Sequence, residues 1–238
     1  TSLSNFPYNT PMLNHTLFFD LDDTLYPKSN GLWNAIRDRM HTYMAEIVAM
    51  PPEEIEALRQ HYLVTYGTTL RGLQIHYQVD TDKYLDYVHD LPLAQFIFPD
   101  PQLGKLLASL PQRKVIFTNA DVHHARRVLA VLQLGDCFEQ IIDIRALGFT
   151  CKPDPSAYSL ALKIAGVTDP QKCILFDDAP RNLAPAQAQG WYTVLVGTPD
   201  ADASACQSIS SLHELPQAMP QLWNHKPGQY PTSRAVDE

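Results

Sequence analysis

The sequence predicts an α/β fold, a doubly wound parallel sheet that carries an all-helical insert. Apolar runs of strand length alternate with helix-length amphipathic segments over the second part of the chain, and one further apolar strand precedes Asp20. The segment between these parts shows helical spacing without a strand-like run. We therefore expect an α/β core at 13–29 and 97–223, a helical insert at 30–96, and irregular termini at 1–12 and 224–238.

The composition is typical of a globular chain that does not bind polyanions. Hydrophobic residues make up 45% of the 238 residues, and the formal net charge is −8 with a pI near 5.5. This balance disfavours a nucleic acid partner, because such binding requires clustered Lys and Arg. The four cysteines form no CxxC pair, which argues against a zinc or thiol redox site. No signal peptide or membrane-spanning run is recognisable, so we expect a cytoplasmic protein without a membrane partner.

The first strand ends in a cluster of carboxylates. Its apolar residues are followed by Asp20, Asp22 and Asp23, whose charges repel one another unless a cation neutralises them. Alternate residues of an extended segment point the same way, so Asp20 and Asp22 would face a phosphate bound beside a Mg²⁺ ion. One would then act as nucleophile and the other as proton donor. The alternative is an acidic turn after a core strand, without a chemical role.

The insert is predicted to contain four helices. Pro51-Pro52 ends the first helix and begins the second, Gly67 is typical of the residue that follows a helix, and Thr81 is a suitable cap for the fourth. These helices are expected at 32–50, 53–66, 69–77 and from Thr81 through Val88.

The following part of the chain alternates between helices and strands. Helices are expected at 100–110, from Asp121 to Leu134, from Pro153 or Pro155 to Gly166, and at 181–189. Strands are expected at 114–117, 140–144, 173–176 and 192–196.

Polar side chains follow several of these elements where a core strand does not need them. Each has an ordinary explanation, such as a helix cap at Thr118 or Asn119, a solvated loop lysine at Lys152, or an acidic turn at Asp177-Asp178. The carboxyl ends of parallel strands meet at one edge of a sheet, however, so we expect these groups to gather with the first acidic cluster. The full set is Asp20, Asp22, Thr24, Thr118, Asn119, Lys152, Asp177 and Asp178.

On these residues the chain resembles the haloacid dehalogenase superfamily of phosphohydrolases. The family's first motif, DxDxT after an apolar strand, matches Asp20, Asp22 and Thr24. Its later motifs are a Ser or Thr after a strand, a lysine and an acidic pair, which match Thr118, Lys152 and Asp177-Asp178. The resemblance extends over about 13–215. It implies a Rossmann-like core and a helical cap that closes over small substrates.

The resemblance also implies a mechanism and a cofactor. Asp20 would attack phosphorus and form an aspartyl-phosphate, while Asp22 would protonate the leaving oxygen and later activate water. Thr118, Asn119 and nearby backbone amides would bind phosphoryl oxygens, and Lys152 would offset the negative charge. The cofactor would be Mg²⁺, with ligands from the Asp20 carboxylate, the Asp22 backbone carbonyl and one of Asp177 or Asp178, of which we favour Asp178 as the direct ligand.

Two features indicate the substrate. An acid at Asp22 favours ester hydrolysis, because the halide that leaves in dehalogenases needs no proton. The segments 19–27, 66–73 and 176–182 look like the pyrimidine 5′-nucleotidase branch, which implies a substrate such as UMP or CMP. Arg71 is expected to meet the substrate, since an arginine offers paired hydrogen bonds to a phosphate or a base carbonyl. Its alternative is a surface arginine paired with an acid.

Other readings of the sequence stay open. In one alternative the protein is still a phosphatase, but its substrate is another small phosphorylated metabolite, such as a sugar phosphate, phosphoglycolate or pyridoxal phosphate. A phospho-acceptor signalling module without turnover is disfavoured by the large helical insert between the acceptor and Thr118. A homodimer is compatible with the sequence. His123 and His124 are expected on a solvated helix face, because no third ligand lies at metal-binding spacing.

Overall fold

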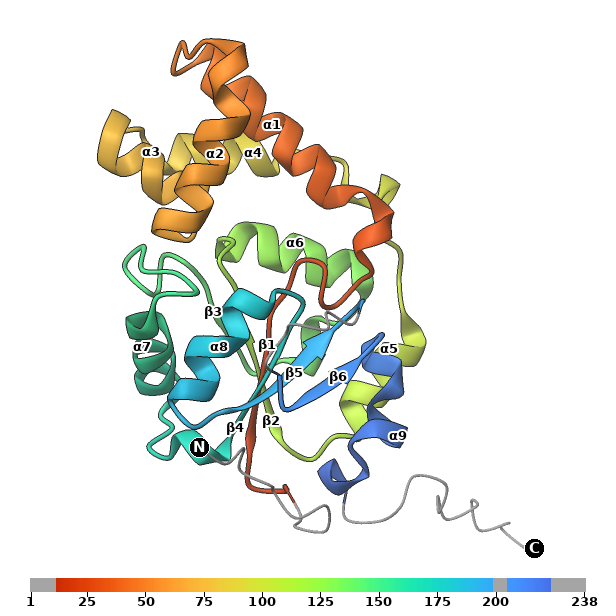
Figure 1. Ribbon diagram of the computed structural model, residues 1–238. Coiled ribbons are helices and arrows are strands. Elements are labelled where there is room, and N and C mark those ends of the chain that lie inside the picture. Colours follow the sequence, from red (N-terminus) through yellow and green to blue (C-terminus); the bar gives the residue numbers. More distant parts are fainter. Residues whose placement is uncertain (1–11, 199–204, 224–238) are drawn as a thin grey trace, which may run out of the picture.

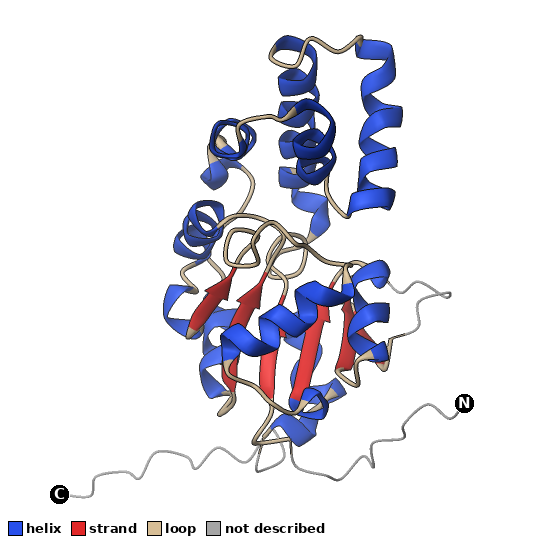
Figure 2. Ribbon diagram, turned by 90° about the vertical axis from the view of Figure 1, so that its left-hand side faces the viewer, coloured by secondary structure: helices blue, strands red, loops and turns tan. Residues whose placement is uncertain are grey.

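The computed structural model describes residues 12–198 and 205–223. Within these residues, six strands form one parallel sheet in the order β3-β2-β1-β4-β5-β6. Helices cover both faces of this sheet (Figures 1 and 2), which confirms the predicted doubly wound α/β fold. The strands are β1 (Thr16–Phe19), β2 (Arg113–Phe117), β3 (Gln140–Ile142), β4 (Cys173–Asp177), β5 (Tyr192–Val196) and β6 (Gln207–Ile209).

The central strand β1 places its carboxyl end level with those of its two neighbours. Phe19 pairs with Ile116 of β2 on one side and with Phe176 of β4 on the other. The Asp20 amide still donates a hydrogen bond to the Phe176 carbonyl, at 2.8 Å. The residues that follow β1, β2 and β4 therefore emerge side by side at one edge of the sheet, where ligands bind in folds of this kind.

Alternation along β1 explains why helices cover both faces. Leu17 and Phe19 belong to a buried cluster with residues of α5, α6 and α9, whereas Phe18 belongs to a second cluster with residues of α7 and α8. Successive side chains of a strand point to opposite faces, so a wholly apolar strand needs helices on both. These helices are α5 (Pro101–Ser109), α6 (Val122–Leu132), α7 (Pro155–Ala165), α8 (Pro180–Ala188) and α9 (Leu215–Ala218).

The predicted insert forms four helices beyond the carboxyl edge of the sheet (Figure 1). They share a buried cluster, in which Tyr62, Leu73 and Tyr84 are less than 3% exposed and which also includes Ile144 and Cys151 of the α/β core. We call this unit the cap. Its helices are α1 (Leu32–Glu46), α2 (Pro52–Tyr66), α3 (Thr69–Tyr77) and α4 (Thr81–His89).

Several contacts join the cap to the α/β core. The Arg181 guanidinium of α8 donates to the Leu63 carbonyl of α2 at 3.0 Å, and Arg145 forms an ion pair with Asp82 of α4. Gly67, which ends α2 with φ 85°, lies against the backbone of Lys152: a Cβ added to this glycine would stand 2.9 Å from the Lys152 carbonyl oxygen. The cap thus rests on the loop before α7.

The structure differs from the predicted elements in a few places. Strand β3 ends at Ile142, two residues before the expected end, and the short strand β6 was not predicted. The residue that caps the N-terminus of α4 is Asp80 and not Thr81 as predicted, because the Asp80 carboxylate accepts hydrogen bonds from two backbone amides. Most of the termini predicted to be irregular lie outside the described residues, and the boundaries at 30 and 96 stay predictions. A search of the described helices finds none with the length and apolarity that crossing a bilayer requires.

Candidate active site

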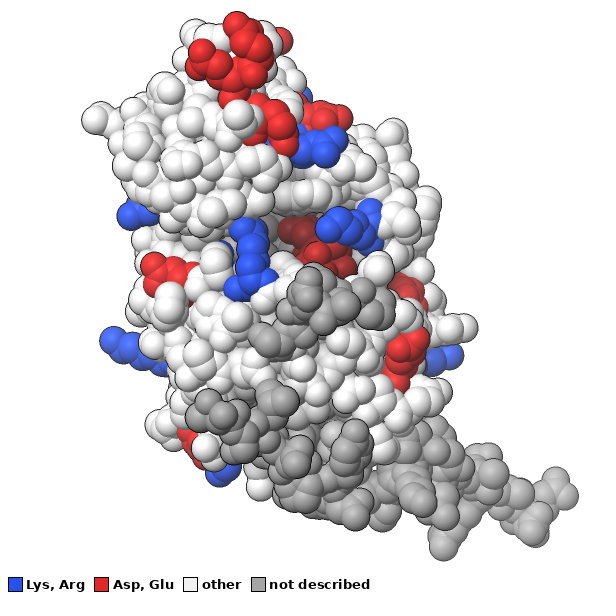
Figure 3. Space-filling model, viewed as in Figure 1, with Lys and Arg blue, Asp and Glu red and all other residues white. Residues whose placement is uncertain are grey.

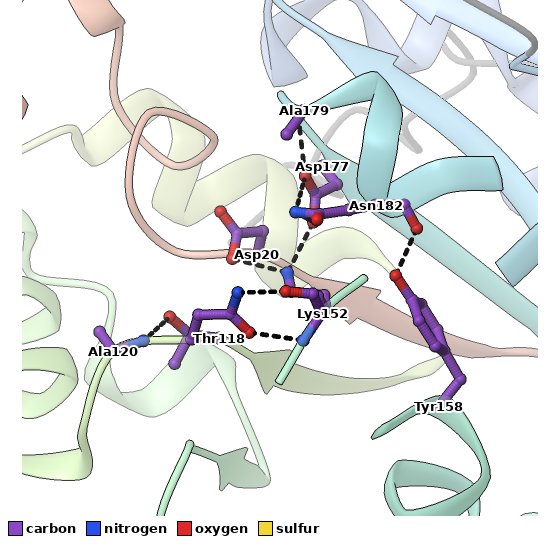
Figure 4. Close-up of polar contacts among 9 residues, drawn as sticks. Asp20, Thr118, Ala120, Lys152, Tyr158, Asp177, Ala179 and Asn182 are labelled. Atoms are coloured by element: carbon purple, nitrogen blue, oxygen red, sulfur yellow. Dashed lines mark hydrogen bonds and ion pairs between the residues drawn. The ribbon is translucent and has the colours of Figure 1, made fainter. Parts of the chain in front are cut away.

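The ends of β1 and β4 bring two carboxylates to one buried lysine. Asp20 directly follows β1, and Asp177 is the last residue of β4. The Lys152 ammonium donates to Asp20 Oδ1 at 2.8 Å and to Asp177 Oδ2 at 2.6 Å. Lys152 is 0% exposed, so its ammonium lies out of contact with water. Figure 4 shows its contacts with the two carboxylates. Three of the predicted site residues therefore meet, although they come from distant parts of the sequence.

Asn119 fixes the loop that carries this lysine. Its amide nitrogen donates to the Lys152 carbonyl at 2.8 Å, and its amide oxygen accepts from the Lys152 backbone nitrogen at 2.9 Å. The two bonds tie the loop to the end of β2. Because both ends of the Asn119 amide are engaged in this way, the side chain positions Lys152, and its predicted contact with substrate stays a prediction.

The charges at this edge of the sheet do not balance. Burial alone would lower the pKa of Lys152, but the charges of Asp177 and Asp20 outweigh it and raise that pKa, so the amine stays protonated. Burial, followed by repulsion from Asp177 and Asp178, raises the pKa of the Asp20 carboxyl, although Lys152 opposes the shift. One ammonium does not neutralise three carboxylates. A bound cation would remove the excess negative charge.

The three carboxylates fit a divalent cation. Oxygens of Asp20, Asp177 and Asp178 lie within 4.8 Å of one another, and carboxylate oxygens are the ligands that Mg²⁺ prefers. Asp177 already accepts from Lys152, from Asn182 Nδ2 and from the Ala179 amide. Within the described residues, no donor of this kind reaches Asp178. The geometry therefore favours Asp178 over Asp177 as a direct metal ligand.

Burial and nearby carboxylates also act on Asp178. Desolvation, then the charges of Asp177 and Asp23, raise the pKa of Asp178 to about 7. A carboxyl group with this pKa holds a proton over part of the physiological range when no cation is present. A cation would displace that proton and restore the ionised ligand.

Thr118 follows β2 and closes the site from the side of that strand. Its side chain is 2% exposed, and its hydroxyl oxygen accepts from the Ala120 amide at 3.0 Å. The residue lines the same cavity as Asp20 and Asp178. Thr118 thus lines the cavity together with Asp20, and its predicted contact with a phosphoryl oxygen stays a prediction.

Asp22 lies close by, but its carboxylate is held by residues of two other segments. Asp22 Oδ1 accepts from the Tyr26 hydroxyl at 2.5 Å and is 2.8 Å from His124 Nε2. Burial opposes ionisation of Asp22, but the charge and hydrogen bond of His124, together with the Tyr26 hydroxyl, outweigh it and lower its pKa. Asp22 is therefore an ionised carboxylate in this arrangement.

The prediction that His124 lies on a solvated face is wrong, whereas His123 is exposed as predicted. The His124 ring is buried and stacks on the His89 ring of the cap, with centroids 4.2 Å apart and planes inclined by 19°. Burial, then the nearby His124, lowers the pKa of His89 to about 3, so that ring is neutral. A signal was available: His124 precedes Val128 by four positions, on the apolar stripe of α6.

A cavity of about 320 Å³ lies between the cap and the edge of the sheet. Figure 3 shows acidic side chains in the hollow between the two parts, with basic side chains on either side. The core contributes Asp20, Asp22, Thr118, Asn119 and Asp178 to its lining. The volume is at the lower end of the range of small-molecule sites, roughly 300–1,000 Å³. The site therefore suits a small ligand.

Arginines other than the predicted one line this cavity. Arg71 is exposed, its guanidinium is 3.4 Å from Gln74 Oε1, and it is not among the lining residues. Arg59 of α2 and Arg181 of α8 do line the cavity. The structure thus does not bring Arg71 to the other site residues, and its contact with substrate stays a prediction. Arg59 was missed because it reads as one of several polar residues on α2.

The sheet, the cap and the group of acids around Lys152 define a hydrolase of one known class. The sequence model of that class, described as "Hydrolase: haloacid dehalogenase-like hydrolase", matches residues 15–190 of the 238. The chain therefore belongs to the haloacid dehalogenase-like hydrolase family.

Particular relatives agree with this assignment. Phosphate metabolism protein 8 of Saccharomyces cerevisiae is 29% identical over 192 residues, which cover 75% of this chain and 60% of that protein. The chain thus spans about three fifths of the length of this curated relative.

Solved structures show the same fold at lower identity. YfnB from Bacillus subtilis, described as a putative HAD-hydrolase bound to magnesium, has a TM-score of 0.61 and 18% identity over 86% of this chain and 97% of its own. An HAD phosphatase from Thermococcus onnurineus has a TM-score of 0.58 and 16% identity over 85% and 96%. These structures support the fold and not a particular substrate.

Proposed function

We propose that the protein is a Mg²⁺-dependent phosphomonoesterase that acts through an aspartyl-phosphate on a small metabolite, and that the metabolite is a pyrimidine nucleoside 5′-monophosphate. One observation carries the proposal: the buried Lys152 ammonium bridges Asp20 and Asp177 at the carboxyl edge of the sheet, next to a cavity that Asp20 lines and the cap covers. A carboxylate, a buried positive charge and a candidate cation site at the same edge of the sheet support this proposal.

The first chemical step would form the covalent intermediate. An oxygen of Asp20 attacks phosphorus, the bond from phosphorus to the ester oxygen breaks, and Asp22 donates a proton to the departing oxygen. Asp22 has to be protonated for this step, although its present partners favour the ionised form. A phosphate dianion bound beside Asp22 would raise its pKa by repulsion and supply the protonated form.

The second step would release phosphate. Asp22, now ionised, accepts a proton from a water molecule, whose oxygen attacks phosphorus, and the bond to Asp20 breaks. The hydrogen bonds from His124 and Tyr26 suit this step, because they orient the carboxylate that acts as base. Lys152 stabilises the charge on Asp20 in both steps. Mg²⁺, held by Asp20, the Asp22 carbonyl and Asp178, would lower the repulsion between carboxylate and phosphate.

The substrate part of the proposal rests on resemblance and on the cavity. The segments around Asp20, Arg71 and Asp177 resemble the pyrimidine 5′-nucleotidase branch, and the name of the yeast relative refers to phosphate metabolism. The cavity offers the size for one small organic group beyond the phosphate. Sugar phosphates, phosphoglycolate and pyridoxal phosphate are the alternative substrates.

Phosphate release from a panel of substrates tests the proposal. UMP and CMP should be hydrolysed faster than ribose 5-phosphate, phosphoglycolate and pyridoxal phosphate, and only with Mg²⁺. EDTA should abolish turnover, and excess Mg²⁺ should restore it. Asp20→Asn, which keeps the side-chain size but removes the nucleophile, should lower kcat by at least about 10³-fold. Equal rates in EDTA and Mg²⁺, or near-normal turnover of Asp20→Asn, would contradict the mechanism.

A further inference from the structure

The side of the cavity that the cap forms, which we call the roof, includes Arg59 and Tyr84, two buried polar residues that the proposed chemistry does not use. Arg59 of α2 is 5% exposed and Tyr84 of α4 is 1% exposed, and both line the cavity that contains Asp20. Arg59 Nε and the Tyr84 hydroxyl are buried without a hydrogen-bond partner among the described residues. Buried polar groups normally have partners, because an unpaired one loses its hydration without compensation.

Three other lining atoms also lack a partner within the part of the chain that the structure describes: Asp23 Oδ1 and Asn182 Oδ1, which are acceptors, and His89 Nδ1, which lies 3.7 Å from Asp121 Oδ1. The donors of Arg59 and Tyr84 have no such explanation, and they indicate a missing ligand.

Neighbouring residues hold both groups in place. Arg59 Nη1 donates to Glu56 Oε2 at 2.9 Å, which anchors one end of the guanidinium and leaves the Nε edge without a partner. The Tyr84 ring packs edge to face against Tyr43, with centroids 4.9 Å apart and planes inclined by 81°. Burial raises the pKa of Tyr84, so its hydroxyl keeps its proton and can donate it in a hydrogen bond. The two donors are therefore ordered before any ligand binds.

The roof also has an apolar part, although Thr68, Thr69 and His89 line the cavity as well. Trp33, Met40, Leu85 and Val88 from the cap line the same cavity, opposite the acids and Thr118 of the core. A flat apolar group with carbonyl oxygens at its edge fits such a surface, because its faces contact apolar side chains while its oxygens accept from the two donors. A sugar phosphate presents hydroxyl groups all round and has no such flat face.

We propose that Arg59 and Tyr84 form a recognition site for the leaving group, in which they donate hydrogen bonds to the carbonyl oxygen that uracil and cytosine share at position 2. This inference rests on the proposed function and assigns substrate selection to two residues of the cap. The phosphate of the same nucleotide lies next to Asp20 and Lys152. The two halves of the cavity thus bind the two ends of one molecule.

Steady-state kinetics with two substrates separate this role from the chemistry. Tyr84→Phe and Arg59→Met each remove a donor, and Arg59→Lys keeps the charge but loses the planar donor edge. In Arg59→Met, KM for UMP should rise by about 10- to 100-fold, while kcat/KM for ribose 5-phosphate should change by less than about 2-fold. Tyr84→Phe should raise KM for UMP by about 5-fold or more. Arg37→Met, at a partly exposed arginine of α1 outside the cavity lining, is the matched control and should leave the kinetics with both substrates unchanged.

Three results would overturn the inference. Arg59→Met could lower activity toward UMP and ribose 5-phosphate equally while melting at the wild-type temperature. Arg71→Met could instead raise KM for UMP while Arg59→Met does not, which would favour the exposed arginine. If Arg59→Met does not fold, Arg59→Lys and Tyr84→Phe decide, and unchanged KM values in both contradict the site.

A binding measurement keeps the test independent of turnover. If the wild type hydrolyses none of the phosphates, the proposed function fails. The recognition site can still be tested by calorimetric titration of UMP into two inactive proteins, Asp20→Asn and the Asp20→Asn, Arg59→Met double variant. Binding that weakens by about 10-fold or more in the double variant supports the recognition site. Equal binding, or none to either protein, overturns it.

Discussion

At the scale of single residues, His124 carries a clear prediction. His124→Leu removes the main partner that lowers the pKa of Asp22, so this pKa should rise, because only the Tyr26 hydroxyl and His89 then oppose the effect of burial. Asp22 accepts a proton from water when the aspartyl-phosphate is hydrolysed, so the acidic limb of the pH profile of kcat should move to higher pH. Its kcat at neutral pH should also fall by about 10-fold or more.

The control for this variant is the neighbouring histidine. His123→Leu changes the same residue type in the same helix, but His123 is exposed and does not contact Asp22. Its pH profile should match the wild type. An unchanged acidic limb in His124→Leu, with normal folding, would show that Asp22 does not depend on this contact.

Single residues also show where prediction from sequence succeeds. Asp20 and Asp177 were predictable because each follows an apolar strand pattern, where a core has no use for a charge. Lys152 was predicted from its place before a helix and from the resemblance to the family's lysine motif. His124 and Arg59 were not found because a helix places polar residues on many positions. Which of these positions turns inward depends on what packs against the helix, and that is a property of the folded chain.

At the scale of elements, the packing of α3 on α2 depends on Gly72. A Cβ built on Gly72 would lie 2.1 Å from Cγ of Tyr62, a buried ring of the cap core. Gly72→Ala should therefore lower the free energy of unfolding by about 1–3 kcal/mol, despite the better helix propensity of alanine. Denaturant unfolding followed by circular dichroism would measure this change.

The matched control is Gly104 in α5. A Cβ there would meet Leu134 at 3.5 Å, an ordinary van der Waals distance. Gly104→Ala should leave the stability unchanged or raise it by about 0.5–1 kcal/mol, because only the helix propensity changes. Equal effects of the two substitutions would contradict the proposed clash with Tyr62.

Most elements follow from local pattern, and the exceptions have physical reasons. Helix spacing, the prolines before α2 and the glycine after it predicted the helices of the cap to within a few residues. Strand β6 was not predicted because its three residues include the polar Gln207 and Ser208, and it depends on pairing with β5. Asp80 and Thr81 are both good capping residues, so their relative backbone geometry decided which one caps α4.

At the scale of the whole molecule, cation binding and proton release should be linked. The pKa of about 7 at Asp178 means that part of the protein holds a proton there when no cation is bound. Mg²⁺ has to displace this proton, so its affinity should rise between about pH 6 and pH 8 and level off above. Calorimetry in buffers of different ionisation enthalpy should show proton release that declines over this range.

The same group affects stability in a defined direction. The pKa of Asp178 is higher in the folded than in the unfolded chain, so this carboxyl stabilises the metal-free fold at low pH and loses that contribution as pH rises toward about 7. The rise in melting temperature on adding Mg²⁺ should therefore be larger near pH 8 than near pH 6. Asp178→Asn should abolish both the proton release and its pH dependence, and an unchanged release would assign the proton to another group.

The arrangement of the cap on the core could not be read from the sequence. Local spacing predicted the two parts, but the bond from Arg181 to the Leu63 carbonyl and the pair of Arg145 with Asp82 join residues far apart in the chain. Those contacts are specific to the folded surfaces, so they leave no local pattern. The cavity between the parts, and the identity of its roof residues, follow from them.

The close contact of Gly67 with the backbone of Lys152 would couple the entry of substrate to the hydration of the loop that carries Lys152. A cap that tilted away from the core to admit substrate would lift the end of α2 from the loop that holds the ammonium. Water would then reach the Lys152 loop in the same motion that exchanges ligand with solvent.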